Sequence, residues 1–425
     1  MATTPFFVPT VPGSRSISAR ALICAALARG RSEIVGLADC DDTTAMINVL
    51  SGCGVRIAGS GDVTEVWGSP KPAFTSDVMD CFASGTTMRF AAALSVTSDQ
   101  PLALTGSSRL MERPMRGLTS ALRTLGKTVD ESEPSGRRIT GAVTVPAVIV
   151  VDAEKSGQFV SGLLMALAAV GAPTRLCARK SASIPFIDMT VSVMRAFGAD
   201  IAVRRCGDVL EFELAGTGYR PTRFTVEPDI MSANYFLAAT LITGGPVFVP
   251  DLATQTIQGD VAMLAVLEKM GAVIEWRDGG VLAHRASDVG LAGTLVDVTD
   301  IPDMTLTLGV VAATAHRPSM LTGVQILRYK ESDRLAALTT ELGKIGVATK
   351  VSGDDNTITI TPPNRLMPAE IATYDDHRMA MSFALLTLVE PHISILDPGC
   401  VSKTWPDFFT ELERYRTHVV SSAPS

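Results

Sequence analysis

The sequence lacks the cysteine and histidine patterns that would indicate a metal site or a disulfide framework. Its 425 residues include seven cysteines, which form no CxxC pairs and have no regular spacing. Such cysteines are typical of reduced, mostly buried thiols in a cytosolic protein. The five histidines are scattered, and Asp376-His377 is an isolated pair rather than a set of ligands. We therefore expect neither a bound metal nor disulfides.

An excess of positive charge is also lacking. Lysine and arginine number 37 against 44 aspartate and glutamate residues, which gives a net charge of −7. Proteins that bind nucleic acids or membrane surfaces favour a basic face, so the charge argues against both functions. No apolar run is long enough to span a bilayer, and residues 1–10 lack the basic-then-apolar order of a signal peptide. These observations predict a cytoplasmic protein with no nucleic-acid or membrane partner.

Three catalytic sequence patterns are missing as well. The phosphate-binding pattern GxxxxGK[ST] is absent, so nucleoside triphosphate hydrolysis is not expected. Neither GxSxG nor a cysteine–histidine arrangement indicates covalent catalysis. Hydrophobic residues make up 46% and charged residues 19% of the chain, which describes a globular protein with ample core. At this length the chain should form two or three domains.

What the chain does contain is a glycine that returns at a nearly constant interval. Gly54, Gly126, Gly198, Gly271 and Gly346 each follow an apolar helical pattern, with successive gaps of 72, 72, 73 and 75 residues. A helix that ends at a left-handed glycine and leads into a strand explains each copy. Five copies, with room for a sixth, indicate that one βα unit was multiplied about six times.

A second repeated element is a short polar cluster that leads directly into an apolar, alanine-rich helix. Helices that are apolar on all sides are usually buried, and their first turns carry unpaired N–H groups that suit phosphate or carboxylate. A plain capping role explains Asp229 and Thr87 equally well. The six clusters are Ser16–Arg20, Ser84–Arg89, Ser156–Gln158, Asp229–Ser232, Asp303 and Asp376–Arg378.

Six units of about 71 residues divide into two lobes of three units each. We expect one lobe at residues 14–226 and the other at residues 1–13 together with 227–425. Three buried parallel helices in each lobe would direct all six helix starts into one cleft, where the active site should lie. The strands expected beside these helices are Leu102–Thr105, Val148–Asp152, Phe224–Glu227, Val247–Val249, Thr357–Ile360 and Ile393–Leu396.

Several basic residues lie beside Gly, Ser or Pro, where an ordinary surface helix would not place them. Each alone is best explained as a solvated charge, but they recur at equivalent points of the repeat. Many cations in an acidic protein indicate small, highly charged ligands, because guanidinium groups match phosphate and carboxylate in geometry. These residues are Arg15, Arg20, Arg89, Arg113, Lys330, Arg334, Arg378 and Lys403.

Three further residues are candidates for proton transfer. Asp303 should begin a buried helix, where low dielectric can raise the pKa of a carboxyl group into a useful range, although a plain helix cap is equally consistent. Glu331 lies three residues before Arg334, so an ordinary ion pair explains it too. His377 can either cap a helix or shuttle a proton.

With these motifs the sequence resembles the enolpyruvyl transferase family over nearly its whole length. The resemblance implies an α/β fold of two similar lobes, each of three βαβαββ units with buried parallel helices, known as an inside-out α/β barrel. The lobes of this family close on their substrates. The motifs are 12–16 (PGSRS), 84–86 (SGT), 111–114 (MERP), 156–159 (SGQF), 330–335 (KESDRL), 376–381 (DHRMAM) and 403–406 (KTWP).

The resemblance also implies the reaction, which needs no cofactor. A hydroxyl group of a phosphorylated acceptor adds to phosphoenolpyruvate, and phosphate then leaves. We expect this protein to act as a monomer on these two small molecules. The residues implied for phosphoenolpyruvate binding are Arg15, Gly85, Arg113, Gln158, Arg334, Arg378 and Lys403. Those implied for the acceptor are Ser16, Arg20, Ser156, Gly157, Gln158, Ser183, Asp303 and Lys330.

The catalytic roles come from the same resemblance. Asp303 would take the proton of the acceptor's hydroxyl group. Glu331, with Lys403 or His377, would handle the proton at C3 of phosphoenolpyruvate. Arg15 stands where the family has a lysine that contacts phosphoenolpyruvate, and arginine keeps the charge but does not release a proton.

The sequence departs from the family at five positions, so the acceptor stays open. Loss of hydroxyl groups from the acceptor pocket at Gly157 and Phe186 could signal a changed acceptor. Shikimate 3-phosphate in aromatic amino-acid biosynthesis is favoured, because most acceptor residues are present. The alternatives are a specialised enzyme for another acceptor, such as the nucleotide UMP, and a catalytically silent binding protein. The departures are Arg15 for lysine, Ala19 for asparagine, Ala83 where Gly-Asn is common, Gly157 for serine and Phe186 for tyrosine.

Overall fold

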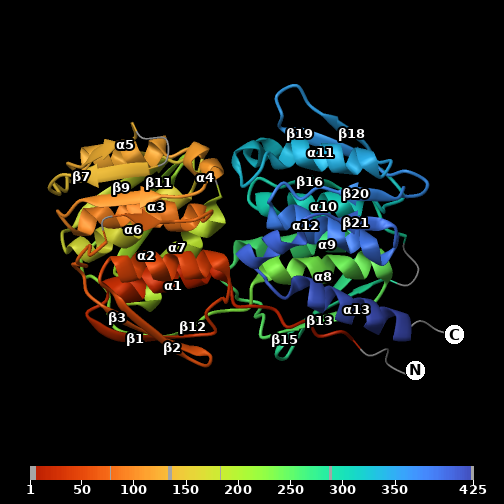
Figure 1. The fold of residues 1–425 in the computed structure, drawn as a ribbon, viewed down its shortest axis with the longest axis horizontal. Coiled ribbons are helices and arrows are strands. Elements are labelled where there is room, and N and C mark those ends of the chain that lie inside the picture. Colours follow the sequence, from red (N-terminus) through yellow and green to blue (C-terminus); the bar gives the residue numbers. More distant parts are fainter. Residues whose placement is uncertain (1–5, 77, 133–135, 182, 287–289, 423–425) are drawn as a thin grey trace. The chain divides into compact units, whose positions relative to one another are not determined.

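Helices and strands alternate along the whole computed structural model, which describes residues 6–76, 78–132, 136–181, 183–286 and 290–422. The chain divides into two compact units, one from Gly13–Val226 and the other from Met1–Pro12 together with Glu227–Ser425. We name them the N-terminal unit and the C-terminal unit (Figure 1). Among the described residues, no helix is long and apolar enough to cross a membrane.

The N-terminal unit contains three sheets with one shared pattern. In each sheet a parallel strand pair is extended by two antiparallel pairs. The sheets are β12-β1-β3-β2 (Arg223–Thr225, Gly30–Val35, Val63–Gly68, Arg56–Ser60), β4-β5-β7-β6 (Met79–Asp80, Leu102–Thr105, Gly136–Thr140, Thr128–Asp130) and β8-β9-β11-β10 (Val148–Asp152, Thr174–Arg179, Val209–Leu214, Ile201–Cys206).

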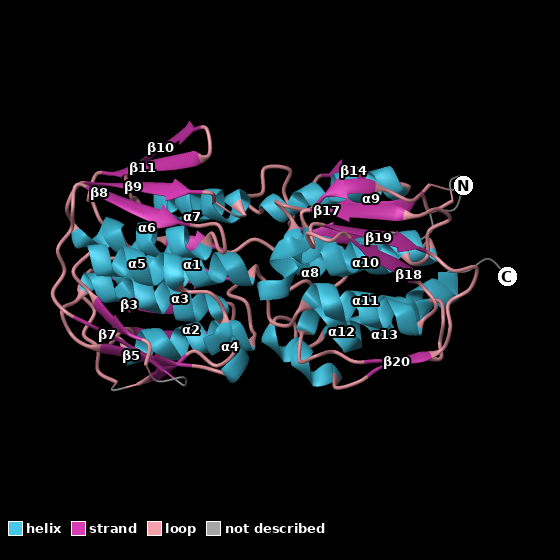
Figure 2. Ribbon diagram, turned by 90° about the horizontal axis from the view of Figure 1, so that it is seen from above, coloured by secondary structure: helices cyan, strands magenta, loops and turns pink. Residues whose placement is uncertain are grey.

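The helices of this unit lie between its sheets, as Figure 2 shows for the strands β8 to β11 on one side and β3, β5 and β7 on the other. The helices are α1 (Arg15–Leu27), α2 (Asp41–Gly52), α3 (Gly85–Leu94), α4 (Ser108–Glu112), α5 (Arg116–Thr124), α6 (Gln158–Val170) and α7 (Ile184–Ala196), with the 3₁₀ helix η1 (Ser95–Thr97) after α3.

The C-terminal unit repeats this sheet pattern in part, and the start of the chain adds a single bridge to one of its sheets. The sheet β16-β17-β19-β18 (Leu295–Asp297, Ser319–Thr322, Thr357–Thr361, Ala348–Val351) has the parallel pair and the two antiparallel pairs. In β13-β15-β14 (Val247–Pro250, Gly280–Arg285, Ala272–Arg277) the parallel partner of Val247 is Phe7. The third sheet is the parallel pair β20-β21 (Ala369–Ile371, Ile393–Ile395).

The helices of the C-terminal unit again include one series that is buried on all sides. They are α8 (Ile230–Thr243), α9 (Met263–Met270), α10 (Thr305–Ala312), α11 (Arg334–Lys344), α12 (His377–Ala384) and α13 (Phe408–Ser422). The 3₁₀ helices are η2 (Gly259–Ala262), η3 (Pro302–Met304), η4 (Val324–Tyr329), η5 (Leu385–Leu388) and η6 (Pro398–Lys403). The predicted α/β class is confirmed.

The prediction of apolar, buried helices is confirmed. Residues 230–242 of α8 and 305–312 of α10 are all buried, and so are residues 17–27 of α1. Helix α10 packs against both α8 and α12, so its apolar sides face other helices rather than solvent. Such burial is the main source of stability for helices of this length.

Several predicted helix starts are wrong. Helix α3 begins at Gly85 rather than after Arg89, because Ser84 caps it and accepts a hydrogen bond from Thr87 N at 3.3 Å. Helix α1 begins at Arg15 rather than Ala21. The polar side chains of its first turns form hydrogen bonds to other segments, so they do not prevent helix formation. Ser18 Oγ, for example, accepts a hydrogen bond from Ala38 N at 3.1 Å. Asp303 was expected to cap a buried helix, but it lies inside η3, and α10 begins two residues later at Thr305.

The predicted strands are found, with small differences at their ends. Leu102–Thr105 and Val148–Asp152 match at both ends. The strand expected at Phe224–Glu227 is β12, Arg223–Thr225, and the one expected at Ile393–Leu396 ends at Ile395. Short segments that alternate buried and exposed residues are recognisable from local pattern alone.

All five repeated glycines adopt the left-handed conformation, with φ between 76° and 114°. A Cβ atom added at Gly126 would also lie 2.6 Å from the carbonyl oxygen of Ala142, too close for an ordinary contact. We expect Gly126→Ala to lower the free energy of unfolding by about 2–3 kcal/mol, because left-handed strain of about 1–2 kcal/mol adds to this overlap. Gly207→Ala is the matched control, since Gly207 is also left-handed but has no atom within 4 Å of the added Cβ. Urea unfolding measures the free energy of unfolding of both variants. Equal decreases would contradict a destabilising steric overlap at Gly126.

Candidate active site

The C-terminal unit gathers charged residues around one buried guanidinium group. Arg334 is the first residue of α11 and is 1% exposed. Its side chain bonds to three carboxylates from three segments: Asp303 at 2.8 Å, Glu331 at 2.9 Å and Asp376 at 2.7 Å. The Asp303 cluster, as we name this group, consists of Asp303, Lys330, Glu331, Arg334, Asp376 and Arg378.

Within the Asp303 cluster the carboxylate of Asp303 is surrounded by cations. Lys330 Nζ lies 3.0 Å from Asp303 Oδ1, and the nearest guanidinium nitrogen of Arg378 lies 3.8 Å from Oδ2. Burial by itself would raise the pKa of Asp303, but Lys330, Arg378 and Arg334 outweigh burial and hold this pKa well below its ordinary value. The expectation of a raised pKa for Asp303 is therefore wrong.

Asp376 is the buried partner that fixes Arg334 in place. It accepts hydrogen bonds from Arg334 Nε at 2.7 Å and from the terminal Nη2 at 3.0 Å, a bidentate arrangement. Ser332 Oγ donates to it at 2.9 Å, and the backbone N–H of Arg378 donates at 3.0 Å, so Asp376 also caps α12. The first turn of α12 and the start of α11 are thus joined by one carboxylate.

The remaining predicted residues of this unit lie on or beside α12. Arg378 is 2% exposed and donates to the hydroxyl group of Tyr235 at 3.3 Å. His377 is fully buried as the first residue of α12, with Nδ1 3.7 Å from Asp376, whose carboxylate is the cap. Lys403 is 8% exposed at the end of η6, which packs against α12.

In the N-terminal unit, Gly85 lies at the centre of a second group of cations. A Cβ atom at Gly85 would lie 2.7 Å from a terminal nitrogen of Arg113 and 2.5 Å from one of Arg89. Arg89 donates to Gln158 Oε1 at 3.0 Å and to the carbonyl oxygen of Gly85 at 3.1 Å. Gln158 in turn donates to Thr86 Oγ1 at 2.9 Å. We name Gly85, Arg89, Arg113 and Gln158 the Gly85 group.

Two helix starts of the N-terminal unit, those of α6 and α7, carry predicted acceptor residues. Ser156 Oγ accepts from the backbone N–H of Gln158 at 3.3 Å, and Gly157 is the residue before α6. Ser183 precedes α7 in a left-handed conformation with φ 56°. Exposed N–H groups at such starts suit an anionic ligand.

Arg20 is held inside the N-terminal unit by other protein groups. It is 2% exposed, and its nitrogens donate to Thr190 Oγ1 at 2.7 Å, to the carbonyl oxygen of Ser16 at 2.7 Å and to that of Phe186 at 3.1 Å. Burial lowers the pKa of Arg20 to about 10. Phe186, which stands where the family has tyrosine, thus contributes its backbone to the same group.

Arg15, at the family's lysine position, forms an ion pair within its own unit. Its terminal nitrogen lies 2.5 Å from Asp42 Oδ2, and the two side chains are 16% and 9% exposed. Asp42 lies in the first turn of α2, where a carboxylate is favourable. An anionic ligand of Arg15 must therefore compete with Asp42.

The structure brings most predicted site residues of each unit together. In the C-terminal unit these are Asp303, Lys330, Glu331, Arg334 and Arg378, and the predicted ion pair of Glu331 with Arg334 is confirmed. The sequence singled out Arg89 only as one of eight candidate cations, gave no role to Tyr235, and treated Asp376 only as part of a helix start. The position of Arg89, four residues after Gly85, was the available signal, because residues four apart share one helix face.

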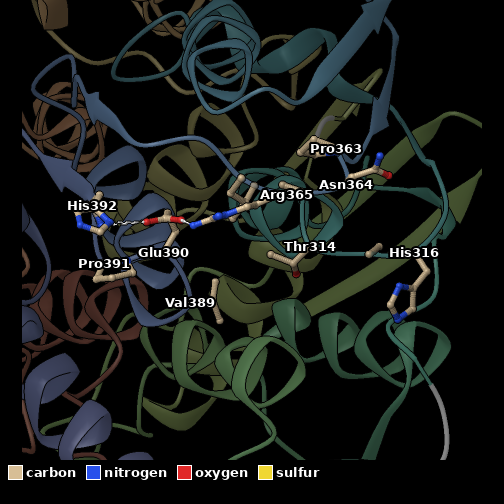
Figure 3. Close-up of a pocket in the computed structure, with 12 residues that line it drawn as sticks. Thr314, His316, Pro363, Asn364, Arg365, Val389, Glu390, Pro391 and His392 are labelled. Carbon is tan, nitrogen blue, oxygen red and sulfur yellow. Dashed lines mark hydrogen bonds and ion pairs between the residues drawn. The ribbon is translucent and has the colours of Figure 1, made fainter.

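A hollow of about 460 Å³ in the C-terminal unit lies apart from the Asp303 cluster (Figure 3). There Glu390 lies between His392, at 2.9 Å, and Arg365, at 3.6 Å. The hydrogen bond from His392 holds the pKa of Glu390 below its ordinary value. Arg365 and His392 are largely exposed, and this hollow contains none of the predicted site residues.

The chemistry available to the two groups is the binding of anions and the transfer of protons. Among the described residues, no three His, Cys, Asp or Glu side chains could hold a metal ion together. Fixed guanidinium and ammonium groups in a buried environment stabilise negative charge strongly. Asp303 and Glu331 add carboxylates that can accept a proton when their cations are drawn away.

Comparison with known proteins agrees with this chemistry. The sequence matches the family described as EPSP synthase (3-phosphoshikimate 1-carboxyvinyltransferase) over residues 8–412. A 3-phosphoshikimate 1-carboxyvinyltransferase of Vibrio cholerae serotype O1 is 41% identical over 409 residues, which cover 94% of each chain. One from Salmonella heidelberg is 38% identical over 417 residues, covering 96% of each chain.

Solved structures show the same fold. The EPSP synthase of Acinetobacter baumannii superposes with a TM-score of 0.77 at 25% identity, covering 96% of this chain and 95% of its own. The enolpyruvyl transferase NikO from Streptomyces tendae has a TM-score of 0.74 at 16% identity over 96% and 94% of the two chains, a likeness of fold alone. With a match along nearly its whole length and relatives about 40% identical, the chain belongs to the EPSP synthase family.

Proposed function

We propose that this protein transfers the enolpyruvyl group of phosphoenolpyruvate to a hydroxyl group of shikimate 3-phosphate and releases phosphate. The observation that carries the proposal is the 41% identity, over 94% of both chains, to a protein named 3-phosphoshikimate 1-carboxyvinyltransferase. The Asp303 cluster and the Gly85 group support it, because each collects cations and helix starts of the kind that bind phosphate and carboxylate.

In the proposed reaction the cations act first. The phosphate and carboxylate of phosphoenolpyruvate bind to Arg113 of the Gly85 group and to Arg334, Arg378 and Lys403. Neutralising these anions lets the neutral hydroxyl group approach C2. Ser16, Arg20, Ser156 and Ser183, with Gln158 and Lys330, bind the acceptor. Holding both molecules also lowers the barrier through positioning.

Proton transfer completes the proposed reaction. Asp303 takes the proton of the hydroxyl group as its oxygen bonds to C2, and C3 gains a proton from Glu331, with Lys403 or His377 nearby. The tetrahedral intermediate then loses phosphate from C2 and a proton from C3, which restores the double bond. Asp303 becomes a stronger base when substrate anions draw Lys330 and Arg378 away from it, because fewer cations then stabilise its charged form.

The acceptor is tested by phosphate release from phosphoenolpyruvate with different acceptors. We expect release with shikimate 3-phosphate and none with UMP. Release with UMP alone would support a specialised acceptor, in line with the missing hydroxyl group at Phe186. Binding of phosphoenolpyruvate without release on any acceptor would indicate a binding protein. Location in the cytoplasm and a monomeric state stay predictions, which fractionation and light scattering can check.

Arg15 provides a test of the phosphoenolpyruvate site. We expect Arg15→Ala to weaken phosphoenolpyruvate binding at least tenfold, about 1.4 kcal/mol or more, because a fixed cation beside the anion is lost. Isothermal titration measures this affinity. Arg31→Ala is a suitable control, since Arg31 pairs with Glu33 and is 47% exposed on β1. Equal affinities of the Arg15 variant and the wild type would contradict the assignment.

A further inference from the structure

Asp260 is a buried acid to which the proposed reaction gives no role. It lies in η2 and is 1% exposed. Its Oδ1 atom is buried and has no hydrogen-bond partner in the part of the chain that the structure describes. A buried carboxyl oxygen without a partner is costly, so its presence calls for an explanation beyond packing.

The charged groups that face Asp260 are those of the Asp303 cluster and one neighbour. They are Asp303 in η3, Arg378 in α12, Lys330 after η4 and Asp229 before α8. Arg378 and Lys330 are also the cations beside Asp303. Burial, followed by the charge of Asp303, raises the pKa of Asp260 to about 7. Asp260 and Asp303 therefore share cations but differ in protonation near neutral pH.

The segment that carries Asp260 is tied firmly to the start of α8. Gln258 Nε2 donates to the carbonyl oxygen of Pro228 at 2.8 Å and to Glu227 at 2.9 Å, and its Oε1 accepts from Ile230 N at 3.1 Å. Asp229, which follows Pro228 in the chain, accepts a hydrogen bond from Ser232 Oγ at 2.7 Å. Asp260 is thus held at a fixed place beside the cations rather than on a mobile loop.

We propose that Asp260 is a positioning residue whose ionised carboxylate strengthens Asp303 as the base that takes the acceptor's proton. A second negative charge in the same cluster opposes the charged form of Asp303 and so raises its affinity for a proton. The two acids then titrate as a coupled pair, with Asp260 ionising as the pH rises through neutrality. This inference rests on the proposed function, since it assigns Asp303 as the base.

The test compares kcat of the wild type and of Asp260→Asn between pH 6 and pH 8. At pH 6 Asp260 is mostly protonated, so the two rates should agree within about twofold. At pH 8 the wild type gains the ionised carboxylate, and the variant should be about tenfold slower. Dividing the two kcat values at each pH removes any effect of substrate titration, because both enzymes meet the same substrates. KM for phosphoenolpyruvate should stay equal or fall, because Arg378 and Lys330 lose a competing anion.

Two further variants make the result decisive. Asp251→Asn is the matched control, because Asp251 is exposed between β13 and η2 and should leave kcat unchanged at every pH. Asp260→Glu keeps a carboxyl group and should keep the rise with pH at a shifted midpoint, which tests the proposal even if Asp260→Asn does not fold. The inference would be overturned by a kcat ratio between wild type and Asp260→Asn that is constant from pH 6 to pH 8, or by an unshifted midpoint in Asp260→Glu. Activity of the wild type with shikimate 3-phosphate would still leave the proposed function intact.

Discussion

Replacing Asp303 by asparagine should lower kcat by about 10²–10⁴-fold, the range expected when a general base is lost. The same change should leave phosphoenolpyruvate binding equal or tighter. Asp303 holds Lys330 at 3.0 Å and Arg334 at 2.8 Å. Asparagine keeps the size of the side chain but removes the charge that competes with the substrate for these cations.

Steady-state phosphate release and isothermal titration with phosphoenolpyruvate separate the two effects. Asp300→Asn serves as the control, because Asp300 lies three residues away and is exposed. A variant that loses kcat and affinity together would indicate that Asp303 organises the site rather than acting as the base. Wild-type kcat in Asp303→Asn would exclude Asp303 as the base altogether.

Asp376→Asn should destabilise the C-terminal unit by about 3 kcal/mol, because it leaves a buried guanidinium group short of one counter-charge. Asp376 is fully buried and binds Arg334, which is 1% exposed, through two hydrogen bonds. Glu331 and Asp303 still face Arg334 in the variant, so complete unfolding is not expected. Urea unfolding followed by far-ultraviolet circular dichroism measures the change.

Asp355→Asn is a closely matched control for this change. Asp355 also binds an arginine through two hydrogen bonds, to Arg328 at 2.7 and 2.8 Å, but its side chain is 42% exposed. Exposed ion pairs contribute about 0.2–1 kcal/mol, so this variant should lose little stability. Equal losses in the two variants would show that burial does not set the strength of the Arg334 pair.

Much of the fold could be predicted from the sequence because its signals are local. A glycine that must adopt positive φ marks each helix end, and Gly54 and Gly271 illustrate the first and the fourth copy. Alternating burial in a short strand, as in β5 and β8, is visible without knowledge of its partners. The start of α1 was misplaced because Ser18 bonds to Ala38, a contact that only the folded chain creates.

The electrostatics of the site could not be predicted in the same way. The pKa of Asp303 depends on Lys330, Arg334 and Arg378, which lie 27, 31 and 75 residues further along the chain. A sequence shows that such cations exist but not that they converge on one carboxylate. Asp260 is a stronger example, because nothing in its local sequence distinguishes it from an exposed aspartate.

The starts of the buried helices differ in kind between the two units. In the N-terminal unit the residues before α1, α3 and α6 are Ser14, Ser84 and Gly157, which carry no charge. In the C-terminal unit, Asp229 precedes α8 and Asp376 precedes α12, and Asp303 lies just before α10. The residues before these helices are therefore neutral and suited to holding anions in the N-terminal unit, whereas in the C-terminal unit they are acids that can exchange protons. The pH dependence of activity should accordingly be set by the second half of the gene. In chimaeras that exchange halves between relatives, the pH profile should follow the half that encodes the C-terminal unit.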